Sequence, residues 1–112
     1  MIDLEKMAKE HEKLFPKATL ESQVWKLEEE IDEFRNAETS SQRIQECADI
    51  LIVCFGLFRW CKRTAEITFN RYFFDVPNRL KDNLEEEVKR KWQINLKRKW
   101  EWNGETYHHV EE

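Results

Sequence analysis

The chain has 112 residues, of which 38% are charged and 40% hydrophobic, and its formal net charge is −4. That length predicts one small domain over residues 1–112, for which oligomerisation would be a source of additional buried surface. The negative charge balance argues against a nucleic-acid partner and against an anionic membrane surface.

Features of export or membrane insertion are absent from the sequence pattern. No basic segment followed by an apolar one opens the chain. The longest apolar run, residues 48–58, is interrupted by Asp49 and is shorter than the ~20 residues of a membrane span. Cys47, Cys54 and Cys61 form no CxxC pair, so we expect reduced thiols. These features together predict a cytoplasmic protein that does not enter a membrane.

The first two predicted helices follow from hydrophobic spacing. Only two glycines and two prolines are present, which indicates long regular elements joined by few turns. The pattern predicts a weakly amphipathic helix over residues 2–14, which stops before Pro16. Thr19 can cap a second helix that ends near Asn36 or Ala37. Its apolar residues recur at spacings of three and four, which predicts one apolar stripe along the helix: Leu20, Val24, Leu27, Ile31 and Phe34.

The third predicted helix is the most apolar segment of the chain. Thr39 or Ser40 can cap it, and it runs to about Phe58 with apolar residues on almost every side. A helix that is apolar all round is expected at the centre of a helical bundle.

The rest of the chain is expected to add one or two helices and a tail. Residues 62–76 contain β-branched and aromatic residues without strict alternation, which favours a continued, kinked helix over a strand. Pro77 suits the first turn of a last helix that reaches about Trp100. Residues 101–112 are expected to form a short tail outside the core, where an Asn-Gly pair can make a turn or a short hairpin. The predicted fold is an all-α bundle of four or five helices.

Two pairs of acidic residues stand on neighbouring predicted helices. Glu30 and Glu33 are three positions apart, so their side chains leave the same side of the second helix. Glu46 and Asp49 have the same spacing on the third helix, where Asp49 lies in an almost wholly apolar run. An ionised carboxylate in such surroundings needs a partner, either a basic side chain or a metal ion. For Asp49 taken alone, a structural salt bridge is an equal alternative.

The two acidic pairs together favour a metal ion over a salt bridge. Four carboxylates that converge in a bundle repel one another unless cations neutralise them. All-oxygen ligation suits Mg²⁺, with Mn²⁺ as the alternative. A di-iron site in such a bundle would use Glu-x-x-His pairs, and no histidine stands at the required positions.

The spacing of the acids resembles the signature of a known family. Glu29-Glu30-x-x-Glu33, followed after twelve residues by Glu46-x-x-Asp49, is similar to the EExxE…ExxD signature of the MazG-like all-α NTP pyrophosphohydrolases. This superfamily includes MazG, the dimeric dUTPases and dCTP pyrophosphatase.

The flanking segments extend the resemblance over most of the chain. KLEEEIDEF at 26–34 and ECADILIV at 46–53 look like the family's own helices, except that Asp32 stands where many members have glycine. The run KWQINLKRKW at 91–100 is similar to the family's KxxxNxxR segment, which contacts substrate phosphates and base.

The resemblance implies a function and a metal. It implies a Mg²⁺-dependent enzyme that hydrolyses a (d)NTP between its α- and β-phosphates, giving a monophosphate and pyrophosphate, in nucleotide-pool sanitation. Members build their pocket at or near a subunit interface, so a homodimer or homotetramer is expected. The metal ligands that it implies are Glu30, Glu33, Glu46 and Asp49.

The resemblance also implies roles for residues around the metal. Glu29, beside the catalytic ligand Glu30, is expected to orient or deprotonate the attacking water, with a surface role as its alternative. Lys91 and Arg98 are expected to contact phosphates, and Asn95 the sugar or base. Trp25 can stack on a base, although aromatic residues at helical spacing more often lie in a core or an interface.

Two other functions remain open from the sequence. One is the phosphoribosyl-ATP pyrophosphohydrolase reaction of the same superfamily, for which no feature of the sequence argues. The other is a catalytically silent helical module of the same fold that binds a partner or nucleic acid. Response to Mg²⁺ separates that module from the enzyme.

Overall fold

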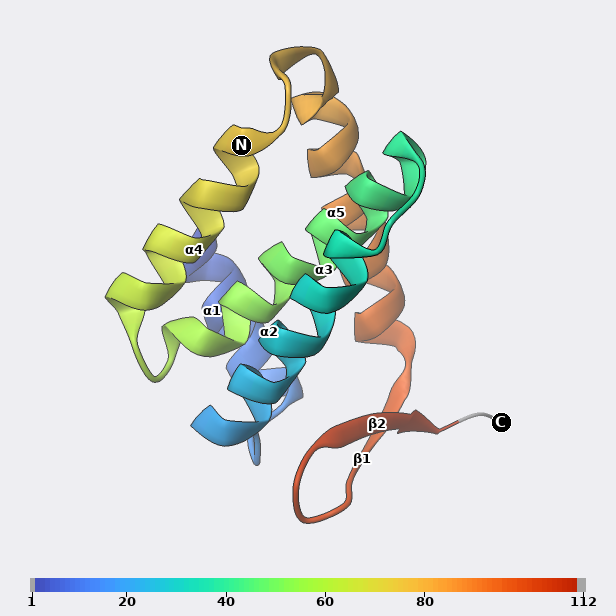
Figure 1. The fold of residues 1–112 in the computed structure, drawn as a ribbon. Coiled ribbons are helices and arrows are strands. Elements are labelled where there is room, and N and C mark those ends of the chain that lie inside the picture. Colours follow the sequence, from blue (N-terminus) through green and yellow to red (C-terminus); the bar gives the residue numbers. More distant parts are fainter. Residues whose placement is uncertain (1, 111–112) are drawn as a thin grey trace.

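The computed structural model describes residues 2–110, most of which are helical (Figure 1). Within this part of the chain there are five α-helices, one short 3₁₀-helix and a two-stranded hairpin. In chain order the elements are α1 (Leu4–Leu14), α2 (Leu20–Arg35), α3 (Ser40–Phe58), α4 (Lys62–Asp75), η1 (Asn78–Leu80), α5 (Lys81–Lys97), β1 (Lys99–Trp102) and β2 (Tyr107–Val110).

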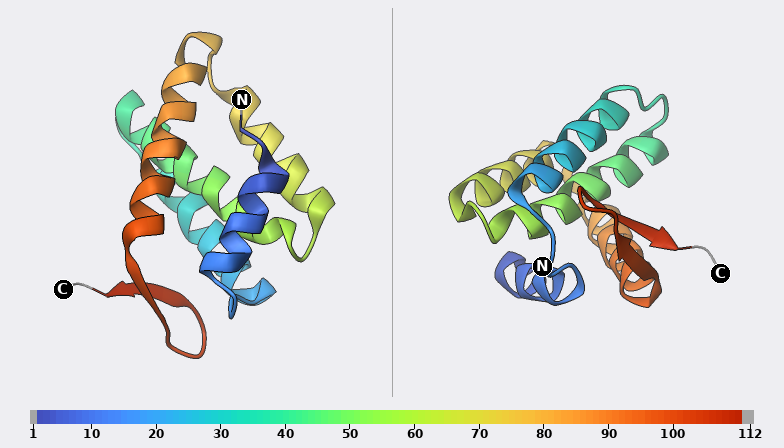
Figure 2. Two further views of the ribbon diagram at one scale, coloured as in Figure 1. Left: turned by 180° about the vertical axis from the view of Figure 1, so that it is seen from behind. Right: turned by 90° about the horizontal axis from the view of Figure 1, so that it is seen from below.

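Helix α3 lies at the centre of the bundle, and α1, α2, α4 and α5 all pack against it (Figures 1 and 2). Its fully buried residues include Cys47, Ile50, Leu51 and Phe55. The prediction that this helix is the most buried element is confirmed. None of the helices in residues 2–110 combines the length and the apolar character needed to cross a membrane.

Reciprocal side-chain caps fix the starts of α2 and α3. Thr19 Oγ1 accepts a hydrogen bond from the backbone N–H of Ser22 at 3.0 Å, and Ser22 Oγ accepts one from the Thr19 N–H at 3.0 Å. Thr39 and Gln42 make the same exchange at the start of α3. Each cap satisfies two backbone donors that a helix start leaves free. The predicted capping positions of both helices are confirmed.

Loss of the α3 cap should lower stability measurably. Thr39→Ala removes the oxygen that accepts from Gln42, and an N-cap substitution of this kind costs about 1 kcal/mol. Urea unfolding of the variant should show a lower midpoint at an unchanged slope. Ser41→Ala, at an exposed position in the first turn of the same helix, is the matched control. Equal midpoints for both variants would contradict a stabilising cap.

The last helix differs from its predicted bounds at both ends. Residues 62–75 form helix α4, as favoured, but Pro77 precedes the η1 turn and α5 begins only at Lys81. At its other end α5 stops at Lys97 rather than near Trp100. The indole N–H of Trp100 donates to the Asn95 carbonyl at 2.9 Å, and packing of this ring draws the chain out of helical geometry.

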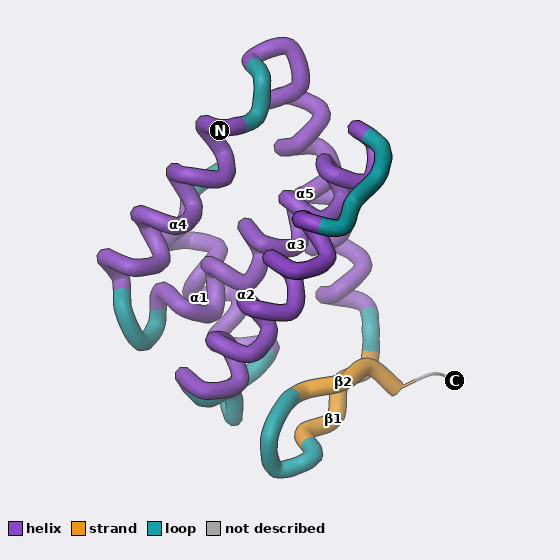
Figure 3. Tube along the Cα trace, viewed as in Figure 1, coloured by secondary structure: helices purple, strands orange, loops and turns teal. Residues whose placement is uncertain are grey.

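An antiparallel hairpin follows α5 (Figure 3). Its turn contains Gly104 at φ +97°, a left-handed conformation that favours glycine, so the predicted Asn-Gly hairpin is confirmed. The tail was expected to lie outside the core, and Tyr107 is an exception. Its ring lies 5.0 Å from that of Phe15, and its hydroxyl accepts a hydrogen bond from the Lys17 N–H at 2.9 Å. Part of the tail therefore belongs to the packed structure.

Helix α2 does not turn the whole of its predicted stripe inward. Leu20 and Val24 are exposed, whereas the polar residues Ser22 and Gln23 are buried. The apolar stripe therefore does not face the core over the first half of the helix. The physical reason is that the polar face that includes Gln23 lines a cavity against α3, as described next.

Candidate metal centre and adjoining cavity

Three predicted ligands come together where α2 and α3 lie side by side. One carboxylate oxygen from each of Glu30, Glu33 and Glu46 lies within 4.8 Å of the other two. Glu30 and Glu33 project from one face of α2, and Glu46 projects from α3 toward them. The three-residue spacing in the sequence and the packing of two capped helices thus produce a single group of acids.

Burial makes this cluster electrostatically unfavourable without a cation. Oε2 of Glu30 and Oε2 of Glu46 are buried, and neither has a hydrogen-bond partner among residues 2–110. Burial first, and then the charges of Asp49, Glu33 and Glu46, raise the pKa of Glu30 to about 8. Burial also raises the pKa of Glu46. An all-oxygen group with unpaired buried acceptors is the donor set that a hard divalent cation prefers.

Asp49, the fourth predicted ligand, has a basic partner instead. Its Oδ2 lies 2.8 Å from the Lys91 ammonium of α5, and both side chains are partly exposed. Burial raises the pKa of Asp49, while the hydrogen bond and the charge of Lys91 act in the opposite direction. The structure therefore shows the salt bridge, the alternative left open for Asp49, beside the acidic cluster. It also places Lys91 next to the predicted metal site.

Replacing Lys91 should strengthen Mg²⁺ binding while weakening the metal-free fold. In Lys91→Met the Asp49 carboxylate loses its counter-ion, so its charge adds to the cluster. Removing one positive charge a few ångström away changes cation binding by about 1–4 kcal/mol, so affinity should rise about tenfold. Calorimetric titration with Mg²⁺ and thermal melting in chelator measure the two effects. Lys89→Met, at an exposed position on the same helix, should change neither. Unchanged Mg²⁺ binding in Lys91→Met would show that Asp49 is remote from the bound ion.

A cavity of about 220 Å³ adjoins the cluster, and Glu30 and Asp49 are part of its wall. The cations Lys26 and Arg98 and the amide of Asn95 also line it. A triphosphate is polyanionic, so cations beside a metal site would attract it. The structure thus brings Asn95 and Arg98, two predicted substrate-binding residues, to the same space as the acids.

Aromatic rings form another part of the cavity wall. Phe15 follows α1, and Trp100 and Tyr107 come from the hairpin. The Phe15 ring lies 5.0 Å from each of the other two rings. The cavity therefore combines a charged region with an aromatic one, which suits a ligand that has both an anionic and a flat apolar part.

Two predicted site residues lie elsewhere in this structure. Glu29 is exposed and is not part of the carboxylate group. Trp25 is 51% exposed and lines a different hollow, together with Trp60. Neither residue is brought to the cavity by the folding of one chain.

Sequence reasoning missed several cavity residues, one group of which left a signal. Gln23, Lys26, Glu30 and Glu33 follow one another at spacings of three, four and three, so they share a face of α2. That polar periodicity could have identified Gln23 and Lys26. No comparable signal exists for Tyr107, because its contact with Phe15 joins segments that are distant in the chain.

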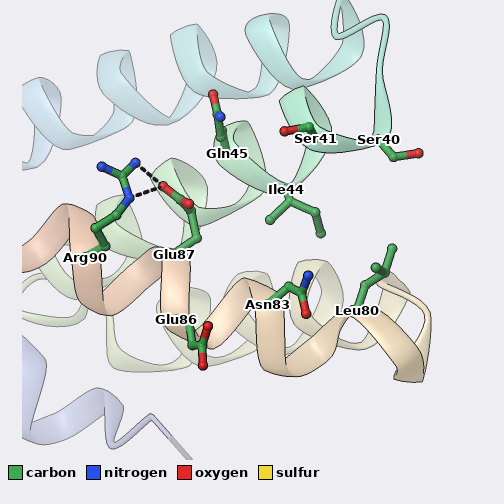
Figure 4. Close-up of a pocket in the computed structure, with 9 residues that line it drawn as sticks. All are labelled: Ser40, Ser41, Ile44, Gln45, Leu80, Asn83, Glu86, Glu87 and Arg90. Carbon is green, nitrogen blue, oxygen red and sulfur yellow. Dashed lines mark hydrogen bonds and ion pairs between the residues drawn. The ribbon is translucent and has the colours of Figure 1, made fainter.

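A larger, more open hollow of about 470 Å³ lies between the start of α3 and the η1–α5 segment (Figure 4). Its charged residues include Glu87 and Arg90, which pair with each other across one turn of α5. None of the nine residues drawn there is a predicted site residue. Glu30, whose buried Oε2 has no partner among residues 2–110, lines the smaller space, which is therefore the better candidate site.

No protein-family model, curated protein or solved structure compared with this chain matches it.

Proposed function

We propose that this chain is a Mg²⁺-dependent nucleoside triphosphate pyrophosphohydrolase of the MazG-like kind. The observation that carries the proposal is the group of three carboxylates with oxygens within 4.8 Å of one another. Two of these carboxylates have buried oxygens without a partner among residues 2–110. Acidic residues that only solvate a helix surface keep their oxygens in water. Buried carboxylate oxygens without a partner would instead be stabilised by coordination to a divalent cation.

The residues divide into a metal-binding and a phosphate-binding group. Glu30, Glu33 and Glu46 would hold the ion. Asp49 could join them if its salt bridge to Lys91 opened. Bound Mg²⁺ supplies charge neutralisation and a water of lowered pKa. Lys91, once released from Asp49, would be free to contact phosphate oxygens. Lys26 and Arg98 stand in the same cavity as further cations.

The proposed reaction is hydrolysis between the α- and β-phosphates of a (d)NTP, which releases a monophosphate and pyrophosphate. We also propose that the protein is cytoplasmic and acts as a homodimer or homotetramer. Leu20, Val24 and Trp25 of α2 and the nearby Trp60 expose apolar surface that a second copy would bury.

The test is pyrophosphate release from a panel of canonical and modified (d)NTPs, with Mg²⁺ and with chelator. The parent protein is compared with Glu46→Gln and Asp49→Asn, and with Glu28→Gln as an exposed control on α2. We expect Mg²⁺-dependent release of pyrophosphate and the matching monophosphate from the parent and the control alone. Turnover that survives both site substitutions, or no turnover of any nucleotide, would refute the catalytic assignment.

One observation favours a second candidate, a non-catalytic module with the same helical fold. Glu29, the residue expected to act on the attacking water, is exposed and outside the cluster. Such a module would use its exposed aromatic surface to bind a partner. Thermal melting separates the candidates, because only the enzyme requires a rise in melting temperature with added Mg²⁺.

A further inference from the structure

The β1–β2 hairpin forms one wall of the cavity, although little of it is packed against the helices. Trp100 of β1 and Tyr107 of β2 both line the cavity. The hairpin projects from the end of α5 to the edge of the bundle (Figures 1 and 2), and none of residues 98–110 is fully buried. The helical side of the cavity is different, because its residues include three that are at most 7% exposed: His11, Gln23 and Val53. The hairpin is therefore the wall that can move at the lowest cost in packing.

The base of the hairpin is attached to the end of α5. Arg98 leaves helical geometry, with φ −75° and ψ 153°, and joins α5 to β1. The indole N–H of Trp100 donates to the Asn95 carbonyl at 2.9 Å, a contact between residues five positions apart. A contact this close to the joint can persist while the far end of the hairpin moves. The base therefore has the character of a pivot.

The far end of the hairpin is held across the cavity by Tyr107. This residue pairs with Trp102, at the end of the two-stranded ladder nearest the turn. Its hydroxyl accepts a hydrogen bond from the backbone N–H of Lys17, in the α1–α2 connection, at 2.9 Å. Its ring also lies 5.0 Å from that of Phe15. The hydrogen bond is exposed to water and contributes little net stability, so it can open without unfolding the bundle.

The hairpin in this position leaves little room for a nucleotide. The cavity extends from Glu30 and Asp49, at the acidic cluster, to the aromatic rings of the hairpin, and its volume is about 220 Å³. Sites for drug-sized ligands typically have ~300–1,000 Å³. A nucleoside triphosphate has a base, a sugar and three phosphate groups, so it belongs to that range. The cavity must therefore widen to admit one, and the loosely packed hairpin is the wall that can give way.

Taking the proposed hydrolase function as the basis, we propose that the β1–β2 hairpin is an autoinhibitory lid, which covers the nucleotide pocket of the ligand-free protein and is held shut by the hydrogen bond between Tyr107 and Lys17. A ligand that fits only the open arrangement shifts the protein toward it, and its apparent affinity falls with the fraction of protein that is closed. The hydroxyl of Tyr107 therefore weakens nucleotide binding, even though its ring lines the pocket.

Tyr107→Phe tests the lid because it keeps the ring and deletes only the hydroxyl. We expect α,β-imido analogues of the four canonical dNTPs, with Mg²⁺, to associate about fivefold faster with the variant, because the lost hydrogen bond belongs to the closed state. Dissociation should be unchanged. A tyrosine that instead held the nucleotide would, when altered, speed dissociation. Stopped-flow binding measures both rates. Tyr72→Phe in α4, outside the cavity, is the matched control and should change neither.

Hydrogen exchange in the parent, without nucleotide, tests the opening itself and needs no variant. The Lys17 amide is the donor to Tyr107, so it should exchange each time the hairpin opens. Its exchange should be far faster than that of the Leu51 amide at the centre of α3, which requires unfolding of the domain. Exchange of Lys17 as slow as that of Leu51 would overturn the lid, whatever the protein hydrolyses.

The two measurements separate failure of the lid from failure of the hydrolase. Unchanged or weaker analogue binding by folded Tyr107→Phe would overturn the lid and leave the hydrolase intact. Binding that tightens in the variant, with no triphosphate hydrolysed by either protein, would support the lid and refute the proposed function. If neither protein binds any analogue, the two proposals fail together.

Discussion

Glu30→Gln is expected to abolish the proposed Mg²⁺-dependent hydrolysis and, at the same time, to stabilise the metal-free protein. In the parent, Glu30 is half-buried next to Glu33 and Glu46, and its Oε2 has no partner among residues 2–110. An amide of the same shape cannot ionise, so at pH 8 and above, where Glu30 carries its charge, the repulsion falls. The same change removes a proposed metal ligand, and loss of the ion should lower kcat/KM of the proposed reaction by at least about a hundredfold.

The pH dependence of stability provides a second signature of Glu30. Its pKa is raised from 4.5 to about 8 in the folded protein, chiefly by burial and then by the charge of Asp49. Between these values the folded state binds more protons than the unfolded state, so the free energy of unfolding should fall as pH rises toward 8. Glu30→Gln should flatten this decline. Saturating Mg²⁺ should also flatten it in the parent, because the ion stabilises the ionised carboxylate.

Chemical unfolding in chelator at several pH values between 5 and 9 tests both statements, with activity measured on the same preparations. Glu28→Gln, an exposed acid on the same helix, is the control and should match the parent in both assays. If Glu30→Gln were less stable than the parent at pH 8 in chelator, repulsion between the carboxylates would not be destabilising the metal-free protein. The electrostatic account of the site would then be wrong.

Trp92→Ala is expected to cause the largest loss of stability of any single change considered. Trp92 is 1% exposed in the centre of the bundle. Its ring lies edge-on to Phe55 at 5.5 Å and stacks on His11 at 6.0 Å, and its indole N–H donates to Glu10 at 3.3 Å. Removal of such a side chain costs about 3–5 kcal/mol. That is a large part of the ~5–15 kcal/mol that stabilises a typical domain.

Guanidinium unfolding monitored by far-UV circular dichroism measures this loss without relying on tryptophan fluorescence. Ile67→Ala is the control, because Ile67 of α4 is 58% exposed and its removal should change stability by less than about 0.5 kcal/mol. Similar losses for the two variants would contradict the dominant role of the buried Trp92 ring.

The local parts of the fold could be predicted because their causes are local. Thr19 and Thr39 precede apolar periodic segments, and both cap helices in the structure. The carboxylate group followed from spacing alone, since residues three apart share a helix face and the two helices are consecutive. Gln23 shares that face but was overlooked among charged residues.

The remaining features depend on contacts between residues that are far apart in the chain, and the spacing of residues in the sequence does not reveal such contacts. Asp49 pairs with Lys91 because α5 packs on α3, and the sequence left a salt bridge and a metal as alternatives. The end of α5 was misplaced because docking of the Trp100 ring outweighs the helical pattern that continues through residue 100.

The contact between Tyr107 and the α1–α2 connection also bears on the order in which the protein assembles. The carboxylates of Glu30, Glu33 and Glu46 belong to the successive helices α2 and α3. They therefore come together as soon as these two neighbouring helices pack against each other. The aromatic wall needs Tyr107 to reach Lys17, a separation of 90 residues. Contacts between distant segments form later in folding because loop closure opposes them. A ribosome-bound chain would thus bring the three carboxylates together before the cavity beside them can close.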